Sequence, residues 1–255
     1  MTRPILTLSD VSVHYKRGMP WNSQSVVAVS QATMAIAESE TLGLVGESGS
    51  GKSTIGKICL GLLKPTAGTA TLLGEPILGI GRRKPGTLAA VLQHPEWSLN
   101  PKLTIGRSIA EPLRVAGTTA AEEQRKVAAI LERVGLNEAF ARRLPGELSG
   151  GQRQRASIAR ALITAPRFVV FDEAVSALDV SIQAQILNMV KELQVEMKFA
   201  SLFISHDLAA VRYVAHNIIV MNKGEIVDRA AAKSFYAPMS NPYVRKLQEA
   251  SGLVA

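Results

Sequence analysis

Hydrophobic and polar positions alternate with a period of two along the first forty residues of the chain. Four such stretches have the pattern of strands that bury one face, at residues 5–8, 11–15, 26–29 and 33–36. A polar stretch, residues 16–24, separates the first pair from the second and is predicted to be a loop. The pattern therefore predicts an antiparallel β region over residues 1–40.

After residue 40, short apolar runs alternate with helical stripes, in which apolar residues recur three or four positions apart. Strands are predicted at the apolar runs, which are residues 41–45, 69–73, 88–92, 168–171, 202–204 and 218–221. Residues 225–227 are predicted to form a hairpin with the last run. The helical stripes are Ile55, Ile58, Cys59 and Leu62; Val127, Ile130, Leu131 and Val134; Ala156, Ala159 and Ile163; and Ile182, Ile186, Met189 and Leu193. This alternation predicts an α/β fold with a helical insertion between about residues 95 and 165.

A glycine-rich segment lies between the strand at residues 41–45 and the first helical stripe. It matches G-x-x-x-x-G-K-[ST], the loop that wraps the phosphates of a nucleotide, with the residues Gly46, Glu47, Ser48, Gly49, Ser50, Gly51, Lys52, Ser53 and Thr54. Glycines let the backbone curl so that N–H groups point inward, and the helix N-terminus adds partial positive charge. Lys52 is expected to reach the β- and γ-phosphates, and Ser53 to offer its hydroxyl to Mg²⁺. A flexible glycine-serine loop is the alternative, but the flanking strand and helix favour a nucleoside triphosphate site.

Two carboxylates, Asp172 and Glu173, follow the apolar run at residues 168–171. Such a run is typical of a buried parallel strand, and ligands of parallel sheets bind at the carboxyl ends of the strands. Asp172 is expected to hold Mg²⁺ through a water, and Glu173 to orient or deprotonate the attacking water. The alternative is an acidic helix cap after a core strand.

A second glycine cluster, residues 148–154, opens the helical stripe that begins at Ala156. Ser149 and the N–H groups of Gly150 and Gly151 are predicted to form a second helix start that can bind an anion. Taken alone, Ser-Gly-Gly at a helix start is only a capping loop.

In their order and spacing, the phosphate loop (residues 46–54), residues 148–154 and residues 168–173 resemble the nucleotide-binding subunit of an ABC transporter. The resemblance covers almost the whole chain. It implies an α/β P-loop NTPase fold with a mixed sheet, in one ABC ATPase domain over residues 1–255. The implied parts are the antiparallel β region at 1–40, a RecA-like core at 41–93 and 166–255, and a helical signature subdomain at 94–165.

The resemblance also implies roles for single residues. Gln93 corresponds to the glutamine loop that senses the metal, His206 to the switch histidine, and Asp179 to the last residue of the D-loop at 176–179. Tyr15 stands where the family stacks an aromatic ring on adenine. Outside this context, Gln93 is an ordinary loop residue, His206 a turn or cap residue beside Asp207, and Tyr15 a strand aromatic that packs against a neighbour.

In the family, two nucleotide-binding subunits meet head to tail, and each signature segment contacts the ATP of its partner. The implied ligands are therefore ATP and Mg²⁺, and the signature residues that contact the partner's nucleotide are Ser149, Gly150, Gly151 and Gln152. ATP joins the two subunits, and its hydrolysis, served by Glu173, His206 and Gln93, opens the interface.

Residues 93–101, with Ser-Leu-Asn-Pro at their end, resemble the glutamine loop of peptide and nickel importers. Asn241-Pro242-Tyr243 resembles the C-terminal His-Pro-Tyr of these importers. The resemblance to these importers implies that the transported cargo is a peptide, a metal ion or a metal chelate. The pair Ala174 and Val175 departs from the usual Pro-Thr but keeps Glu173. The C-terminal cysteine cluster of many relatives is missing, so no iron–sulfur centre is expected.

The implied partners are transmembrane permease subunits, a second ATPase subunit (a second copy or a paralogue) and an extracytoplasmic substrate-binding protein. Residues 95–111 are predicted to dock on the permease because Trp97 lies in an otherwise polar loop. A Trp97 packed in the core is the alternative. We expect a peripheral protein on the cytoplasmic face of the cell membrane. A soluble ABC protein of the ribosome or of DNA repair is less favoured, because the chain has one cassette and no sustained heptads.

Composition adds little to this interpretation. Hydrophobic residues make up 47% of the chain, no apolar run is long enough for a membrane span, and the single cysteine, Cys59, is consistent with a reducing compartment. The net charge of +8 could serve nucleic acid, but Lys and Arg are scattered apart from residues 82–84 and no aromatic residues interleave with them. No nucleic-acid partner is therefore expected.

Overall fold

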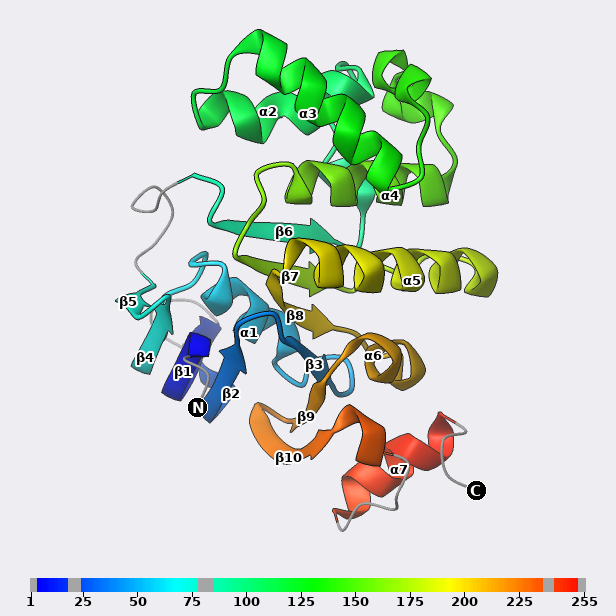
Figure 1. Ribbon diagram of the computed structural model, residues 1–255. Coiled ribbons are helices and arrows are strands. Elements are labelled where there is room, and N and C mark those ends of the chain that lie inside the picture. The colour runs from blue at the N-terminus through cyan, green and yellow to red at the C-terminus, as the bar shows by residue number, and fades with distance from the viewer. Residues whose placement is uncertain (1–3, 18–23, 78–84, 236–240, 252–255) are drawn as a thin grey trace. The chain divides into compact units, whose positions relative to one another are not determined.

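The computed structural model describes residues 4–17, 24–77, 85–235 and 241–251. The chain forms two compact units, Met1–Arg82 with Ala200–Ala255, and Arg83–Phe199. Figure 1 shows the elements of each. Within the described ranges, no helix is both long and apolar enough to cross a membrane.

The first unit contains an antiparallel sheet in the order β2-β1-β4-β5. Its strands are β1 (Pro4–Arg17), β2 (Gln24–Ala37), β4 (Ala67–Leu72) and β5 (Glu75–Pro76). The antiparallel region expected at the start of the chain is thus confirmed. The four short strands predicted there are, however, joined in pairs into two long strands, β1 and β2. Irregularities of pairing near Asp10, whose φ is 49°, let β1 continue from the predicted strand at residues 5–8 into the one at residues 11–15. The side chain of Thr33 accepts a hydrogen bond from the Asp10 N–H at 2.9 Å and so satisfies the backbone at this point.

The same unit contains a second set of strands in which β3 (Thr41–Val45) lies between β8 (Ala200–Ile204) and β9 (Asn217–Asn222), parallel to both. β10 (Glu225–Ala231) pairs with β9 as the predicted hairpin. All residues of β3 and β8 are buried, as the apolar runs predict. The helical elements are α1 (Lys52–Cys59), α6 (Leu208–Val214), the short 3-10 turn η4 (Ala232–Ser234) and α7 (Pro242–Ala250).

One residue of the first helical stripe does not lie where the pattern predicts. Helix α1 ends at Cys59, and Leu62, which we expected on its buried face, is 53% exposed. Gly61, at a φ of 70°, ends the helix one turn earlier than the apolar spacing indicates. Ile55, Ile58 and Cys59 are buried as expected.

The second unit pairs β6 (Leu88–Leu92) in parallel with β7 (Phe168–Asp172). Its helices are α2 (Ile105–Val115), α3 (Ala120–Arg133), α4 (Gly150–Leu162) and α5 (Val180–Met197), with 3-10 turns η1 (Pro95–Trp97), η2 (Glu138–Arg142) and η3 (Pro145–Glu147). Helix α4 lies between β6 and the pair α2 and α3 (Figure 1). The helical stretch predicted between residues 95 and 165 is therefore present.

The fold class predicted from the sequence is confirmed, since parallel strands, helices, an antiparallel sheet and a helical insertion all occur. The finer boundaries expected within one domain, at residues 40, 93 and 165, remain predictions.

Candidate functional site

The phosphate loop connects β3 to α1, and two of its positions, Gly46 and Gly51, accommodate only glycine. A Cβ atom on Gly46 would collide with the carbonyl oxygen of Met221, and one on Gly51 would lie 2.5 Å from the carbonyl oxygen of Ala28. Gly51 also has a φ of 105°, in the region that side chains disfavour. The neighbouring strands thus enclose the loop and hold its curled backbone.

Lys52 points back into this loop. Its Nζ donates hydrogen bonds to the carbonyl oxygens of Gly46, at 2.7 Å, and Glu47, at 2.8 Å, and the side chain is 7% exposed. Carbonyl dipoles offset the cost of burying the ammonium and fix it inside the curl. Ser53 and the loop tip at Ser48 and Gly49 are exposed, Thr54 is half-buried, and the Ser50 hydroxyl is buried.

His206 lies at the same sheet edge as the phosphate loop. It follows β8, and because Leu44 and Ile204 are register partners in β3 and β8, the two segments leave neighbouring strands together. A cavity of about 450 Å³ is lined by Gly46, Glu47 and His206, among others. The imidazole is exposed, while the neighbouring Asp207 caps α6 by accepting from the Ala210 N–H at 3.0 Å. The residue that caps the helix is therefore Asp207 and not His206. Within the first unit, His206 lies beside the phosphate loop.

Tyr15 lies in β1, where its register partner is Val26. Its side chain is 40% exposed, which leaves part of the ring open to a stacking ligand. A role in holding adenine remains a prediction.

In the second unit, the carboxylates and Gln93 lie at one edge of the β6–β7 pair. Leu92 is the register partner of Asp172, so Gln93 and Glu173 each follow the end of a neighbouring strand. Glu173 has a φ of 54°, and its carbonyl oxygen accepts from the Ser176 hydroxyl at 2.9 Å. This left-handed backbone is strained for a non-glycine residue, and the Ser176 bond helps to hold it.

The departure at Ala174 and Val175 has a structural basis. Both side chains are buried, at 3% and 1% exposure. These two small apolar side chains therefore belong to the buried interior and directly follow Glu173 in the chain.

The signature segment at residues 148–154 starts α4 with a capping box. Ser149 Oγ accepts from the Gln152 N–H at 3.3 Å, and Gln152 Oε1 accepts from the Ser149 N–H at 3.0 Å. Ser149 and Gly150 are exposed, and so is Asp179 at the N-cap position of α5. The helix start is therefore preorganised and accessible, and its binding of an anion remains a prediction.

A Mg²⁺ ion fits the residues that are present. No group of three or more His, Cys, Asp or Glu side chains in the described ranges could hold a metal without other ligands. Mg²⁺ in nucleotide sites is commonly held by one or two protein oxygens together with phosphates. Each unit contains one such oxygen donor, the hydroxyl of Ser53 in the first and the carboxylate of Asp172 in the second.

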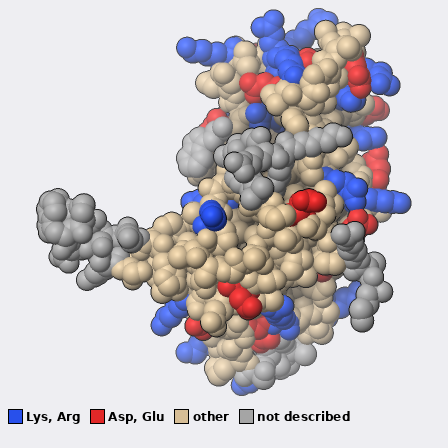
Figure 2. Space-filling model, turned by 90° about the vertical axis from the view of Figure 1, so that its left-hand side faces the viewer, with Lys and Arg blue, Asp and Glu red and all other residues tan. Residues whose placement is uncertain are grey.

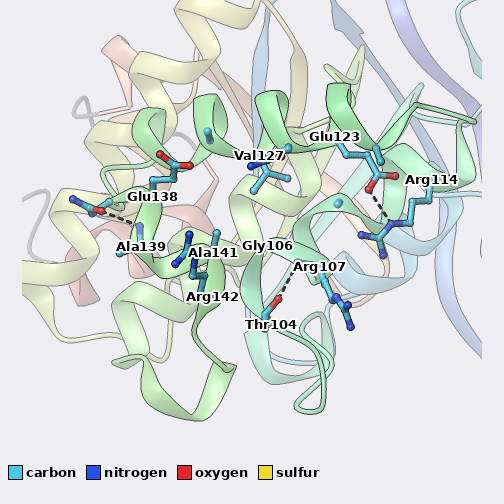
Figure 3. A pocket seen from close by; sticks show the side chains of 15 residues that line it. Thr104, Gly106, Arg107, Arg114, Glu123, Val127, Glu138, Ala139, Ala141 and Arg142 are labelled. Carbon is cyan, nitrogen blue, oxygen red and sulfur yellow. Dashed lines mark hydrogen bonds and ion pairs between the residues drawn. The ribbon is translucent and has the colours of Figure 1, made fainter.

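The helical part of the second unit contains a cavity of about 760 Å³ that we call the α2–α3 groove (Figure 3). Its walls come from α2, α3 and η2, and it carries the charged residues Arg107, Arg114, Glu123, Glu138 and Arg142. Arg114 and Glu123 form an ion pair across it at 3.0 Å. Sequence patterns gave no sign of this groove, because it is formed by elements packing together. The predicted docking segment, 95–111, supplies part of its α2 wall, but the Trp97 side chain lies outside the described residues.

On the face seen in Figure 2, Lys and Arg do not form one stripe but are interspersed with Asp and Glu around a largely uncharged surface. The basic run at residues 82–84 lies outside the described residues.

Comparison with known proteins gives consistent similarities. A family profile described as ABC transporter matches residues 29–176. The chain is 42% identical over 257 residues to the oligopeptide transport ATP-binding protein OppF of Escherichia coli, covering 96% of this chain and 77% of OppF. It is 48% identical over 226 residues to a Brucella abortus protein whose name assigns it provisionally to peptide import, covering 86% of this chain and 68% of that protein.

Among solved structures, a dimeric ATP-binding cassette, MJ0796, in a post-hydrolysis state with ADP and phosphate matches with a TM-score of 0.77 and 28% identity. The match covers 89% of this chain and 98% of the cassette. The likeness extends to both the sequence and the fold.

Proposed function

Since this chain belongs to the ABC transporter family and is an ATP-hydrolysing enzyme, we propose that it energises the import of peptides as the ATPase subunit of a membrane importer. The observation that supports this most is the 42% identity over nearly the whole chain to an oligopeptide transport ATPase. Nickel or metal-chelate cargo, which the sequence left open, has no support among these relatives, whose names refer to peptides. Their transport names also disfavour a soluble ribosome- or DNA-associated role.

In this proposal, the phosphate loop binds the β- and γ-phosphates of ATP through its backbone N–H groups and Lys52. The buried ammonium, fixed by two carbonyls, loses little entropy when a phosphate enters. Ser53 and Asp172 would hold Mg²⁺, which when bound neutralises phosphate charge, and Gln93 would respond to it. The half-exposed ring of Tyr15 would stack on adenine.

Hydrolysis needs a base for the attacking water and a donor for the phosphoryl oxygens. Glu173 is assigned the first task because it directly follows the last residue of β7, at the strand end where ligands of parallel sheets bind. His206 is assigned the second because it is exposed beside the phosphate loop. The geometry around both residues supports these roles.

The signature residues would bind the nucleotide of a second ATPase subunit. Ser149, Gly150, Gly151 and Gln152 form a capped helix start whose N–H groups can receive a γ-phosphate, and the exposed Asp179 lies on the same unit. The dimeric state of the solved cassette supports such pairing. The partner is either a second copy or a paralogue.

The α2–α3 groove is the surface that we assign to the permease. It is large enough for a short helix and carries charges of both signs, which can fix the register of a polar cytoplasmic segment. A permease partner, together with an extracytoplasmic substrate-binding protein, would hold the chain peripherally on the cytoplasmic face of the membrane.

Affinity purification of the tagged chain from mildly solubilised cells tests the importer assignment. We expect multispan membrane subunits to co-purify with it, and a Glu123→Arg and Arg142→Glu double variant to lose them. Recovery of ribosomes or DNA in place of membrane subunits would overturn the assignment in favour of the soluble alternative.

A further inference from the structure

The C-terminal helix α7 contacts the phosphate loop through a tyrosine. The hydroxyl oxygen of Tyr243 accepts a hydrogen bond from the backbone N–H of Glu47 at 3.2 Å, although the two residues are 196 positions apart. Both belong to the same compact unit. The sequence marks Tyr243 only as part of the importer-like Asn-Pro-Tyr, and this contact places its hydroxyl at the phosphate loop.

The contact acts on a peptide group that Lys52 also holds. The N–H of Glu47 and the C=O of Gly46 belong to one planar peptide unit. Tyr243 accepts from its N–H end, and Lys52 Nζ donates to its C=O end at 2.7 Å. Because the unit is rigid, a hydrogen bond at each end fixes its rotation, and this rotation sets where the Gly46 carbonyl holds the ammonium.

Helix α7 is itself anchored to the unit, so that Tyr243 has a fixed position. Asn241 caps the helix by accepting from the Tyr243 N–H at 2.9 Å, and its Nδ2 donates to the Val227 carbonyl of β10 at 3.2 Å. Farther along, the buried Gln248 donates to the Phe235 carbonyl at 2.8 Å. Val244 is fully buried on the same side. These anchors hold α7 independently of the nucleotide site.

The surroundings of Tyr243 suit a neutral acceptor. Burial raises the pKa of its hydroxyl, the bond from the Glu47 N–H lowers it, and the Glu47 charge raises it again, with a net increase. The phenol therefore stays protonated around neutral pH. Beyond this bond, the cavity of about 450 Å³ separates Leu247 and Ala250 of α7 from the loop. Because this side of the loop faces a cavity and not packed side chains, the single hydrogen bond from Glu47 to Tyr243 contributes more to holding the loop.

We propose that Tyr243 is a positioning residue that orients the Gly46–Glu47 peptide, and through it Lys52, for binding the phosphates of ATP. This inference rests on the ATP site proposed above and adds the C-terminal helix to it. Loss of the hydroxyl frees the peptide to rotate, so part of the binding free energy is spent on ordering the loop.

The test is the Kd of the full-length chain for Mg-ATP, measured by titration calorimetry at low temperature with Tyr243→Phe. This variant keeps the ring and removes only the acceptor oxygen. We expect the Kd to rise about three- to tenfold, the usual effect of one lost hydrogen bond. Tyr213→Phe on α6, where the ring is 46% exposed, removes a tyrosine hydroxyl elsewhere in the unit and should leave the Kd within about twofold.

A stability measurement separates positioning from a merely structural role. The nucleotide-free Tm of Tyr243→Phe should fall by less than about 4 °C. A Kd within twofold of the wild type, with or without a lower Tm, would overturn the inference. If the wild-type chain itself failed to bind Mg-ATP, the proposed site would fail instead, so the two failures are distinguishable.

A double-mutant cycle shows whether Tyr243 changes the Kd through the backbone N–H of Glu47 or through its side-chain carboxylate. The proposed bond goes to the backbone, so Tyr243→Phe should raise the Kd by the same factor in a Glu47→Ala background. Disappearance of the effect in that background would assign it to the carboxylate and contradict the peptide-orienting role.

Discussion

A side chain on Gly151 would collide with Ile182, because a Cβ built there lies 2.7 Å from the Ile182 Cγ2 atom. The start of α4 and the first turn of α5 therefore approach each other through a glycine. Gly150, one residue earlier, has room: its Cβ would meet Leu178 Cδ2 at an ordinary 3.9 Å. Two adjacent glycines of the signature segment thus differ in what they tolerate.

This difference predicts the effect of alanine at each position on stability. Gly151→Ala should lower the free energy of unfolding by about 1–3 kcal/mol, because the β-branched Ile182 cannot move its Cγ2 without changing rotamer. Gly150→Ala should change it by less than about 1 kcal/mol. Urea unfolding followed by circular dichroism measures both. In the Gly151→Ala background, Ile182→Ala should restore most of the lost free energy of unfolding. If the double variant stays as unstable as Gly151→Ala alone, the contact with Ile182 is not the cause of the loss.

Removal of the buried ammonium should abolish most nucleotide affinity. Lys52→Met is expected to raise the Kd for Mg-ATP about ten- to a hundredfold or more, since hydrogen bonds from charged donors contribute about 1.5–3 kcal/mol. Lys57→Met, in the exposed last turn of the same helix, is the matched control and should bind ATP like the wild type. Equal affinities for the two variants would remove Lys52 from the site.

Glu173→Gln should separate binding from hydrolysis. The amide cannot accept a proton from water, so the ATPase kcat should fall about 10²–10⁴-fold while the Kd for Mg-ATP stays close to that of the wild type. Gel filtration with ATP should then show a trapped dimer with the partner ATPase. Glu196→Gln on α5, whose carboxylate is exposed and paired with Arg133, should leave kcat unchanged. Unimpaired turnover of Glu173→Gln would overturn its role as base.

Charge reversal in the α2–α3 groove should weaken binding of the permease. Arg107→Glu is expected to reduce the affinity for the membrane subunits about tenfold, because it reverses the sign of one of the charges that line the groove. Arg125→Glu, on the exposed face of α3 outside the groove, is the control. Pull-down of permease subunits from detergent measures both. An equal loss in both variants would indicate general electrostatics rather than docking at the groove.

Local features of this fold are readable from the sequence. The phosphate loop and the helix start at Ser149 were predicted because each is built from neighbouring residues whose geometry follows from their own chemistry. The structure adds that Gln152 completes a capping box with Ser149. The buried strands β3, β7 and β8 were predicted because an uninterrupted apolar run is typical of a strand that is buried on both faces.

Features that depend on distant residues were not readable. The continuity of β1 through Asp10 depends on Thr33 in the next strand. The bond between Tyr243 and Glu47 and the α2–α3 groove arise only when elements far apart in the sequence pack together. A periodic pattern shows which face of an element is buried, but not which residue it meets.

Uptake of labelled peptides tests the central claim most directly. Proteoliposomes would carry the permease subunits, the partner ATPase and this chain, with the substrate-binding protein and peptide at the extracytoplasmic side and Mg-ATP at the other. The account predicts peptide accumulation that requires ATP and stops when Glu173→Gln replaces the wild-type chain. Equal accumulation with the wild type and with Glu173→Gln, or none with any peptide under conditions in which ATP is hydrolysed, would contradict it.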